Sequence, residues 1–301
     1  MQSQTLKPAE QANKTVGPER LNWKIIELQV TDLDRATGFW MEALGLRNLG
    51  PHGGGIALGT GERALFILHP GARAPANPRH LGMYHVALGV PDQVAFSRLL
   101  ARLIARRIPV APVDHLMGKS IYISDPDGLG IEITFETPWR FGRFGEMSHG
   151  FSLYDANGRA HNGRERLDVA AELAHARGAN PDAPLADGAF LAHLHLQVAA
   201  LEPAIAWFEG LGFSKNLMLP HLGFSDLSAG GTYTHRLALN TWAGKNLAPA
   251  PPDMARLLRY ELDVSDPSIV VSAPDLERSA QGLTGRDPTG THICVNVPIA
   301  L

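Results

Sequence analysis

Four polar side chains in the middle of the chain have residue types and spacing that could bind a single metal ion. His85 and His193 each lie five residues before the last apolar residue of a short alternating segment. Further along, the segments DPDGLGIE and SAGGTYTH can be aligned, and in this alignment Glu132 corresponds to His235. Two imidazoles and a carboxylate on neighbouring strands can bind one face of an octahedral ion and leave other positions open, which is the chemistry of non-haem Fe(II) sites.

The segment around Glu132 predicts where this carboxylate points. Residues 125–128 (DPDG) indicate a tight turn. The residues that follow, IEITF, alternate in character, so Glu132 and Thr134 should share one face of a strand. His193 and His195 also share a face of their strand, and His195 therefore remains an alternative ligand.

One structural unit recurs four times along the chain. A short strand leads into a helix that begins near an acidic residue, and further short strands follow; self-similarity with a period of roughly 50 to 60 residues indicates an array of such units. Aromatic residues in the helices, such as Trp40 and Phe208, have the helical spacing of core positions. The repeats divide the chain into a polar N-terminal arm (1–21), module 1 (22–78), module 2 (79–138), a connection or lid (139–188), module 3 (189–248) and a degenerate module 4 (249–301).

The composition of the 301 residues narrows the function classes. A net charge of −3 gives no reason to expect binding to nucleic acid or to a membrane surface. No apolar run approaches the roughly 20 residues that a transmembrane helix needs. One cysteine, Cys294, and a polar N-terminal segment without an apolar signal core predict a reduced, cytoplasmic location.

Several motifs together resemble a known group of enzymes. The repeated unit is similar to the βαβββ module of the vicinal oxygen chelate superfamily, and four modules resemble the type I extradiol, catechol 2,3-dioxygenase-like, ring-cleaving dioxygenases. The motifs that carry the resemblance are YHVALGVPD, DHLMGKSIYISDPDGLGIEI, AHLHLQV and SAGGTYTHRLALNTWAG. The resemblance implies metal ligands at His85, His193 and Glu132 and catalytic residues at His235, Tyr122 and His115. It also implies an α+β fold of four modules in two open, barrel-like halves.

The distribution of the ligands predicts how the modules pair. Modules 1 and 4 have Ile25 and Arg259 at the histidine position, and module 4 has Cys294 at the position of Glu132. If the modules paired in sequence order, the proposed ligands would be split between two barrels. We therefore expect modules 2 and 3 to form the metal barrel and modules 1 and 4 to form a second half without a site. The connection at 139–188 is long enough to permit this pairing.

The resemblance implies cleavage of a catechol-type ring by dioxygen, with Fe(II), or alternatively Mn(II), as the metal. The substrate would be a small aromatic diol, His235 would transfer protons, and Tyr122 would hydrogen-bond a substrate oxygen while His115 assists. Association into homo-oligomers is left open. Two alternatives also stay open: a glyoxalase-like metal-dependent lyase or isomerase on the same scaffold, and a non-catalytic protein that binds an aromatic or quinone compound.

Overall fold

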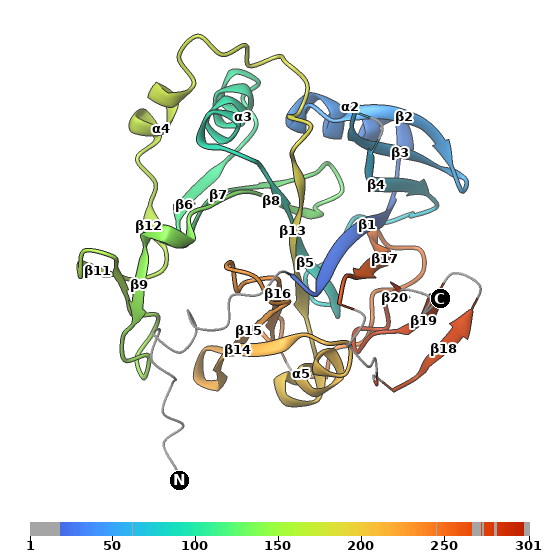
Figure 1. The fold of residues 1–301 in the computed structure, drawn as a ribbon. Coiled ribbons are helices and arrows are strands. Elements are labelled where there is room, and N and C mark those ends of the chain that lie inside the picture. Colours follow the sequence, from blue (N-terminus) through green and yellow to red (C-terminus); the bar gives the residue numbers. More distant parts are fainter. Residues whose placement is uncertain are drawn as a thin grey trace.

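The fold of the computed structural model is built from two large β-sheets with helices packed against them (Figure 1). The structure describes residues 19–61, 63–244, 246–266, 272, 274–279 and 282–297, so most of the arm expected at 1–21 lies outside the described residues. The helices are α2 (Leu33–Leu44), α3 (Gln93–Ala105), α4 (Val169–His175) and α5 (Leu201–Glu209), with short 3₁₀ turns at η2 (Pro138–Arg140) and η3 (Pro220–Leu222).

The eight-stranded sheet joins modules 1 and 4. Its order is β18 (Leu276–Ser279), β19 (Gly282–Arg286), β20 (His292–Asn296), β17 (Arg256–Val264), β1 (Leu21–Val30), β4 (Arg63–Pro70), β3 (Gly55–Thr60) and β2 (Arg47–His52). The opening strands of the two modules, β1 and β17, run antiparallel to each other at the centre of this sheet.

The nine-stranded sheet joins modules 2 and 3 in the same way. Its order is β12 (Glu165–Arg166), β6 (Ala111–Asp114), β7 (Gly118–Ser124), β8 (Gly130–Glu136), β5 (Gly82–Gly89), β13 (Phe190–Gln197), β16 (Leu237–Asn240), β15 (Phe224–Ser228) and β14 (Ser214–Leu219). The opening strands β5 and β13 are antiparallel neighbours. The predicted fold of four modules in two open halves, with modules 2 and 3 together, is confirmed.

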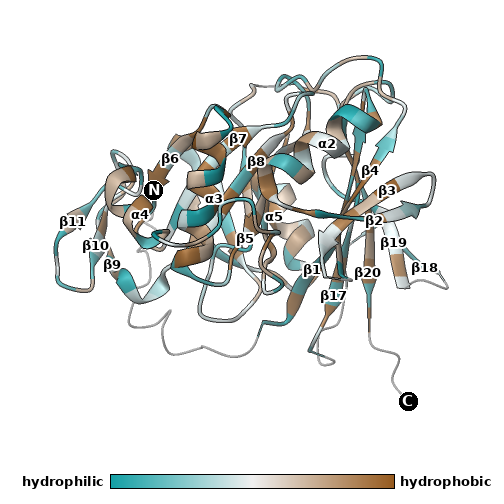
Figure 2. Cartoon of the chain, turned by 90° about the horizontal axis from the view of Figure 1, so that it is seen from above, coloured by the Kyte–Doolittle hydropathy of each residue, from teal (hydrophilic) through white to brown (hydrophobic). Residues whose placement is uncertain are grey.

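The helices begin and pack as their sequences dictate. Asp32 and Asp92 accept hydrogen bonds from backbone N–H groups in the first turns of α2 and α3, which satisfies donors that a helix start leaves unpaired. The core positions expected for Trp40 and Phe208 are confirmed, since both are fully buried in one apolar cluster that spans the four modules. Figure 2 shows apolar stretches on the helices and along the strands of both sheets.

The turn before β8 fixes this strand and also joins the two halves. Asp125 Oδ1 accepts hydrogen bonds from the N–H groups of Asp127 and Leu129 at 2.9 and 2.8 Å, and Gly128 takes a left-handed φ of 81° that closes the turn. Asp127 Oδ2 accepts a hydrogen bond from the backbone N–H of Thr31 in module 1 at 2.7 Å. The strand that carries Glu132 is therefore anchored at its start.

The long connection contains structure of its own. Residues 139–167, which we call the cover segment, include β9 (Phe141–Phe144), β10 (Leu153–Asp155), β11 (Ala160–His161) and β12. The first three form a small separate sheet, and β12 pairs with β6 at the edge of the nine-stranded sheet (Figure 1). Arg140 makes an ion pair with Asp114 of β6 at 2.6 Å. The cover segment is thus held against the half formed by modules 2 and 3.

An ion-pair group fills the corresponding place in the half formed by modules 1 and 4. Arg259 of β17, at the module 4 position equivalent to the ligand histidines, pairs with Glu27 at 2.9 Å and with Glu261 at 2.6 Å. Buried Cys294 lies next to Glu261 in the parallel pairing of β17 with β20. The guanidinium of Arg259 already pairs with the carboxylates of Glu27 and Glu261 at this position, so these carboxylates are not free to bind a metal ion.

Candidate metal centre

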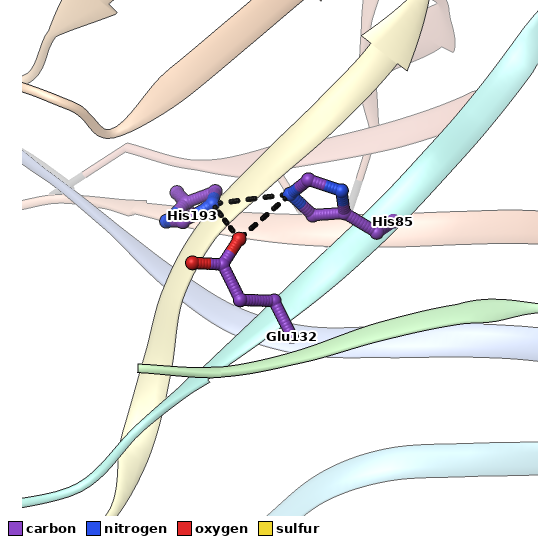
Figure 3. A group of neighbouring side chains, drawn as sticks. All are labelled: His85, Glu132 and His193. Atoms are coloured by element: carbon purple, nitrogen blue, oxygen red, sulfur yellow. Dashed lines mark hydrogen bonds and ion pairs between the residues drawn. The ribbon is translucent and has the colours of Figure 1, made fainter. Parts of the chain in front are cut away.

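Three side chains from two modules converge at the centre of the nine-stranded sheet. Glu132 Oε2 lies 2.9 Å from His85 Nε2 and 3.1 Å from His193 Nε2, and the two histidine nitrogens are 3.3 Å apart (Figure 3). All three side chains are buried. Among the described residues, no other group of three His, Cys, Asp or Glu side chains comes close enough together to hold a metal ion.

The geometry and electrostatics of this triad fit a divalent cation. In an ideal octahedral site, two ligand atoms at right angles, each about 2.1 Å from the ion, are about 3.0 Å apart. The three separations observed between His85 Nε2, Glu132 Oε2 and His193 Nε2 are close to this value. Burial lowers the pKa of His193 to about 3, so its imidazole is neutral at pH 7. Burial alone would raise the pKa of Glu132, but interactions with His193 and His85 outweigh burial and hold this pKa well below 4.5. The result is an anionic donor set with free nitrogen lone pairs.

The pairing of β5 with β13 decides which histidine of module 3 joins the triad. His195, the alternative ligand, lies directly opposite His85 in the register of the two strands, and its ring is 4.8 Å from the ring of His85. Its Nε2 atom is 2.9 Å from the side-chain amide of Asn240. His195 is therefore engaged beside the triad, and His193 supplies the second converging nitrogen.

The structure corrects the alignment of Glu132 with His235. Glu132 pairs with Ala87, which lies two positions after His85. Ala238 pairs with His195, which lies two positions after His193. Ala238 is thus the counterpart of Glu132, and His235 lies ahead of β16, not on the last strand. The physical reason is loop length: residues 229–236 make an eight-residue connection to β16, whereas five residues, 125–129, lead into β8.

His235 nevertheless reaches the site from this longer loop. Its ring centroid is 4.6 Å from that of His193. Its Nδ1 atom lies 3.2 Å from Asp226 Oδ2 on β15, and Asn216 donates a second hydrogen bond to the same oxygen at 3.1 Å. A neutral His235 that donates its Nδ1 proton to Asp226 presents the lone pair of Nε2.

Tyr122 and His115 form a second hydrogen-bonded pair beside the triad. Tyr122 lies directly opposite Glu132 in the pairing of β7 with β8. His115 Nδ1 lies 2.6 Å from the carbonyl oxygen of Gly163, so Nδ1 carries the proton, and Nε2 accepts a hydrogen bond from the Tyr122 hydroxyl at 2.9 Å. Burial is the main cause that raises the pKa of Tyr122 well above 10, and the nearby negative charge of the Glu132 carboxylate adds to it. The hydroxyl is therefore a stable proton donor at neutral pH.

These groups face one cavity of about 620 Å³, a volume typical of small-molecule sites. Its polar wall contains His85, Glu132, Tyr122, His115 and His235. Its apolar wall contains Phe144, Phe151 and Leu153 of the cover segment and Leu217, Phe224 and Trp242 of module 3. The space suits a small, flat, largely apolar molecule with polar atoms at one end.

Two further residues at this cavity were missed by the sequence reasoning. Asp226 has no special sequence context, and only the pairing of β15 with β16 brings it to His235. Arg164 lies in the connection, which is covered by no repeat, and it lines the cavity because β12 pairs with β6.

Comparisons with known proteins agree with this fold. The Glyoxalase/Bleomycin resistance protein/Dioxygenase superfamily matches residues 23–133, which include His85, His115, Tyr122 and Glu132. Residues 23–133 are therefore similar to this superfamily, and the resemblance indicated by the repeated modules is confirmed at that level.

Individual relatives extend the similarity over most of the chain. A curated protein of Bacillus subtilis (strain 168) named catechol-2,3-dioxygenase is 29% identical over 285 residues, which cover 89% of this chain and 94% of that protein. A solved structure from Bacillus subtilis subsp. subtilis str. 168 has a TM-score of 0.57 at 14% identity and covers 94% of this chain and 87% of its own. Glyoxalase I from Zea mays has a TM-score of 0.52 at 15% identity, with 92% of each chain covered. The two solved structures show a shared fold.

No helix among the described residues is long and apolar enough to cross a membrane.

Proposed function

We propose that the chain is an Fe(II)-dependent extradiol dioxygenase that cleaves a catechol-type ring beside one of its two hydroxyl carbons. Both atoms of dioxygen enter the product, and the bond that breaks is a carbon–carbon bond of the ring. One observation carries the proposal: His85 and Glu132 of the triad line the same cavity as three further proton-exchanging side chains, Tyr122, His115 and His235. The named activity of the B. subtilis relative supports the same reaction.

In this proposal, His85, Glu132 and His193 would hold the metal. The bound ion supplies a site where a vicinal diol and dioxygen can bind together and where the diol loses protons more readily. The protein ligands contribute one negative charge, so the site stays cationic and favours an anionic diol. Mn(II) suits the same mixed nitrogen and oxygen donors.

Tyr122 and His115 orient one side of the diol. The Tyr122 hydroxyl, which points to His115 when no substrate is present, can turn its proton toward a substrate oxygen over a short distance. His115 is fixed by the carbonyl oxygen of Gly163 and presents the basic nitrogen that takes part in this exchange. Because both groups are buried, the proton is exchanged with the substrate in preference to bulk water.

His235, whose ring lies beside that of His193, acts as the group that takes up and returns a proton. The hydrogen bond to Asp226 keeps the imidazole in one orientation and stabilises the positive charge that appears when Nε2 takes a proton. The rings of Phe224 and Trp242 are stacked, with their centroids 6.1 Å apart; both line the same cavity and limit the access of water. Because Tyr122 lies beside His85 and His235 lies beside His193, the two proton-exchanging groups suit a reaction in which protons leave and return at different atoms.

The test is anaerobic reconstitution with Fe(II), followed by addition of a catechol panel and air. The proposal predicts uptake of one dioxygen per catechol and a yellow ring-fission product. Metal-dependent turnover of a 2-oxoaldehyde–thiol adduct without oxygen uptake would instead indicate a lyase of the glyoxalase type. Tight binding of catechols without turnover in any metal-loaded form would indicate a binding protein, and either result would overturn the proposal.

A further inference from the structure

Arg236, the residue after His235, is a buried cation that the proposed chemistry does not use. Its guanidinium forms ion pairs with Glu136, the last residue of β8, and with Glu19, which precedes β1. The Nε atom donates a hydrogen bond to Glu19 Oε1 at 2.7 Å, and the Nη2 atom donates one to Glu136 Oε2 at 3.2 Å. Two carboxylates from distant parts of the chain therefore hold the side chain next to His235.

The backbone of Arg236 is fixed as well. Its N–H donates to the carbonyl oxygen of Leu227 on β15 at 3.0 Å, and its carbonyl oxygen accepts a hydrogen bond from the indole N–H of Trp23 on β1 at 3.0 Å. The guanidinium also donates to the carbonyl oxygen of Ala192 on β13 at 3.3 Å. Since Glu136 lies on β8, Arg236 is tied to two of the three strands that carry the triad.

The start of module 1 runs along the eight-residue connection before β16. Glu19 forms an antiparallel bridge with Gly230, and the N–H of Arg20 donates to the carbonyl oxygen of Ala229 at 2.7 Å. The indole of Trp23 contacts the other end of the same connection through the hydrogen bond described above. A segment of the other half of the molecule thus holds both ends of the connection that carries the proton-exchanging histidine.

This connection depends on outside contacts for its shape. Gly230 and Gly231 have positive φ angles of 91° and 72°, which glycine adopts without strain but at a large cost in chain entropy. Asn216 donates a hydrogen bond to Thr234 Oγ1 at 3.1 Å on one side of His235. The hydrogen bond between the His235 ring and its acidic partner on β15 orients the imidazole, whereas the contacts to the neighbouring residues decide where the imidazole lies.

We propose that Glu19 is a positioning residue for His235 and acts through Arg236. This inference rests on the proposed function, in which His235 takes up and returns a proton beside the triad. Without the Glu19 carboxylate, Arg236 keeps its pair with Glu136 but loses its side-chain link to the segment before β1. The backbone next to His235 is then less restrained, and a displacement of about 1 Å is enough to slow a proton transfer between groups held in a fixed geometry.

The experiment is made at Glu19, because removal of Arg236 would leave buried carboxylates unpaired and would mainly test folding. Glu19→Ala should keep its bound iron and lose about tenfold in kcat with less change in KM, and Glu19→Gln, whose amide oxygen still accepts a hydrogen bond, should lose less. In a His235→Gln protein, Glu19→Ala should have almost no further effect on kcat. Asn22→Ala is the matched control with an unchanged kcat, since Asn22 lies in the same segment but donates to Ser265 Oγ at 2.6 Å, after β17.

A spectroscopic measurement keeps the inference separate from the proposed reaction. The protein is labelled with ¹⁵N-histidine and loaded with Zn(II), which is diamagnetic, and the ring resonances of His235 are assigned with His235→Gln. We expect these resonances to shift or broaden in Glu19→Ala and to stay unchanged in Asn22→Ala. This result would support the inference even if the wild-type protein cleaved no ring, which would overturn the proposed function alone. Unchanged His235 resonances in Glu19→Ala, or an equal loss of kcat with His235 present and replaced, would overturn the inference.

Discussion

The Nε2 atoms of His85 and His193 lie 3.3 Å apart, although 108 positions separate the two residues in the chain. Their proximity depends on the antiparallel pairing of β5 with β13, which belong to different modules. A buried pair of imidazole nitrogens that face each other beside a carboxylate is costly unless a proton or a cation lies between them. The relationship therefore links the pairing of the modules directly to the proposed chemistry.

His193 and His195 provide a matched pair of substitutions on one strand. Both are buried and close to His85, but only His193 belongs to the triad. We expect His193→Asn to lose bound iron almost completely, because two remaining ligands hold a divalent cation weakly. His195→Asn should keep about one iron per chain. Iron measured by mass spectrometry after anaerobic loading and gel filtration checks both; the reverse pattern would make His195 the ligand.

Substitution of Tyr122 separates metal binding from proton exchange. Tyr122→Phe should keep its iron, since the hydroxyl is not part of the triad, and kcat should fall by about 100-fold through loss of a general acid or base. Tyr84→Phe is the control, because Tyr84 lines the same cavity but its hydroxyl makes no hydrogen bond within the described residues. If both variants lose rate equally, the hydroxyl of Tyr122 has no special role.

Asp226 should act only through His235. In Asp226→Asn the imidazole loses its anionic partner, so kcat should fall by roughly tenfold or more while KM and iron content change little. The same substitution made in a His235→Gln protein should have almost no further effect on kcat. Steady-state rates of the two single variants and the double variant measure this coupling, and additive losses would show that the two residues act independently.

The ion pair between Asp114 and Arg140 should make the anchoring of the cover segment dependent on pH. Burial alone would raise the pKa of Asp114, but hydrogen bonds from Arg140 and from the N–H of Leu116 outweigh it and lower the pKa below 3.8. A lowered carboxyl pKa stabilises the fold above the ordinary pKa, and this stability is lost as the pH falls through the folded-state value. The difference in free energy of unfolding between wild type and Asp114→Asn, about 1 kcal/mol at pH 7, should thus shrink below pH 3.8. Urea unfolding at several pH values measures it; a difference that grows in acid would contradict the assignment.

The sequence predicted a shared site from the histidine position that modules 2 and 3 have in common and from the carboxylate of Glu132, although the module 3 counterpart of Glu132 is Ala238. His85, His193 and Glu132 lie on opening and closing strands of two similar modules, and their shared chemistry indicated that modules 2 and 3 must pair. The register of His235 could not be predicted, because the loop before β16 is three residues longer than its counterpart and an alignment without gaps hides this. Arg164 lies in a connection without a repeated counterpart, and its place depends on long-range pairing of β12 with β6.

The central claim is that His85, Glu132 and His193 hold one metal ion at the junction of modules 2 and 3. Calorimetric titration of the metal-free protein with Mn(II) under anaerobic conditions tests it most directly, with Glu132→Gln as the comparison. We predict one ion per chain for the wild-type protein and an affinity weaker by roughly 100-fold or more in Glu132→Gln, since an anionic ligand is replaced by a neutral amide. Equal affinity and equal stoichiometry in the two proteins would contradict the account.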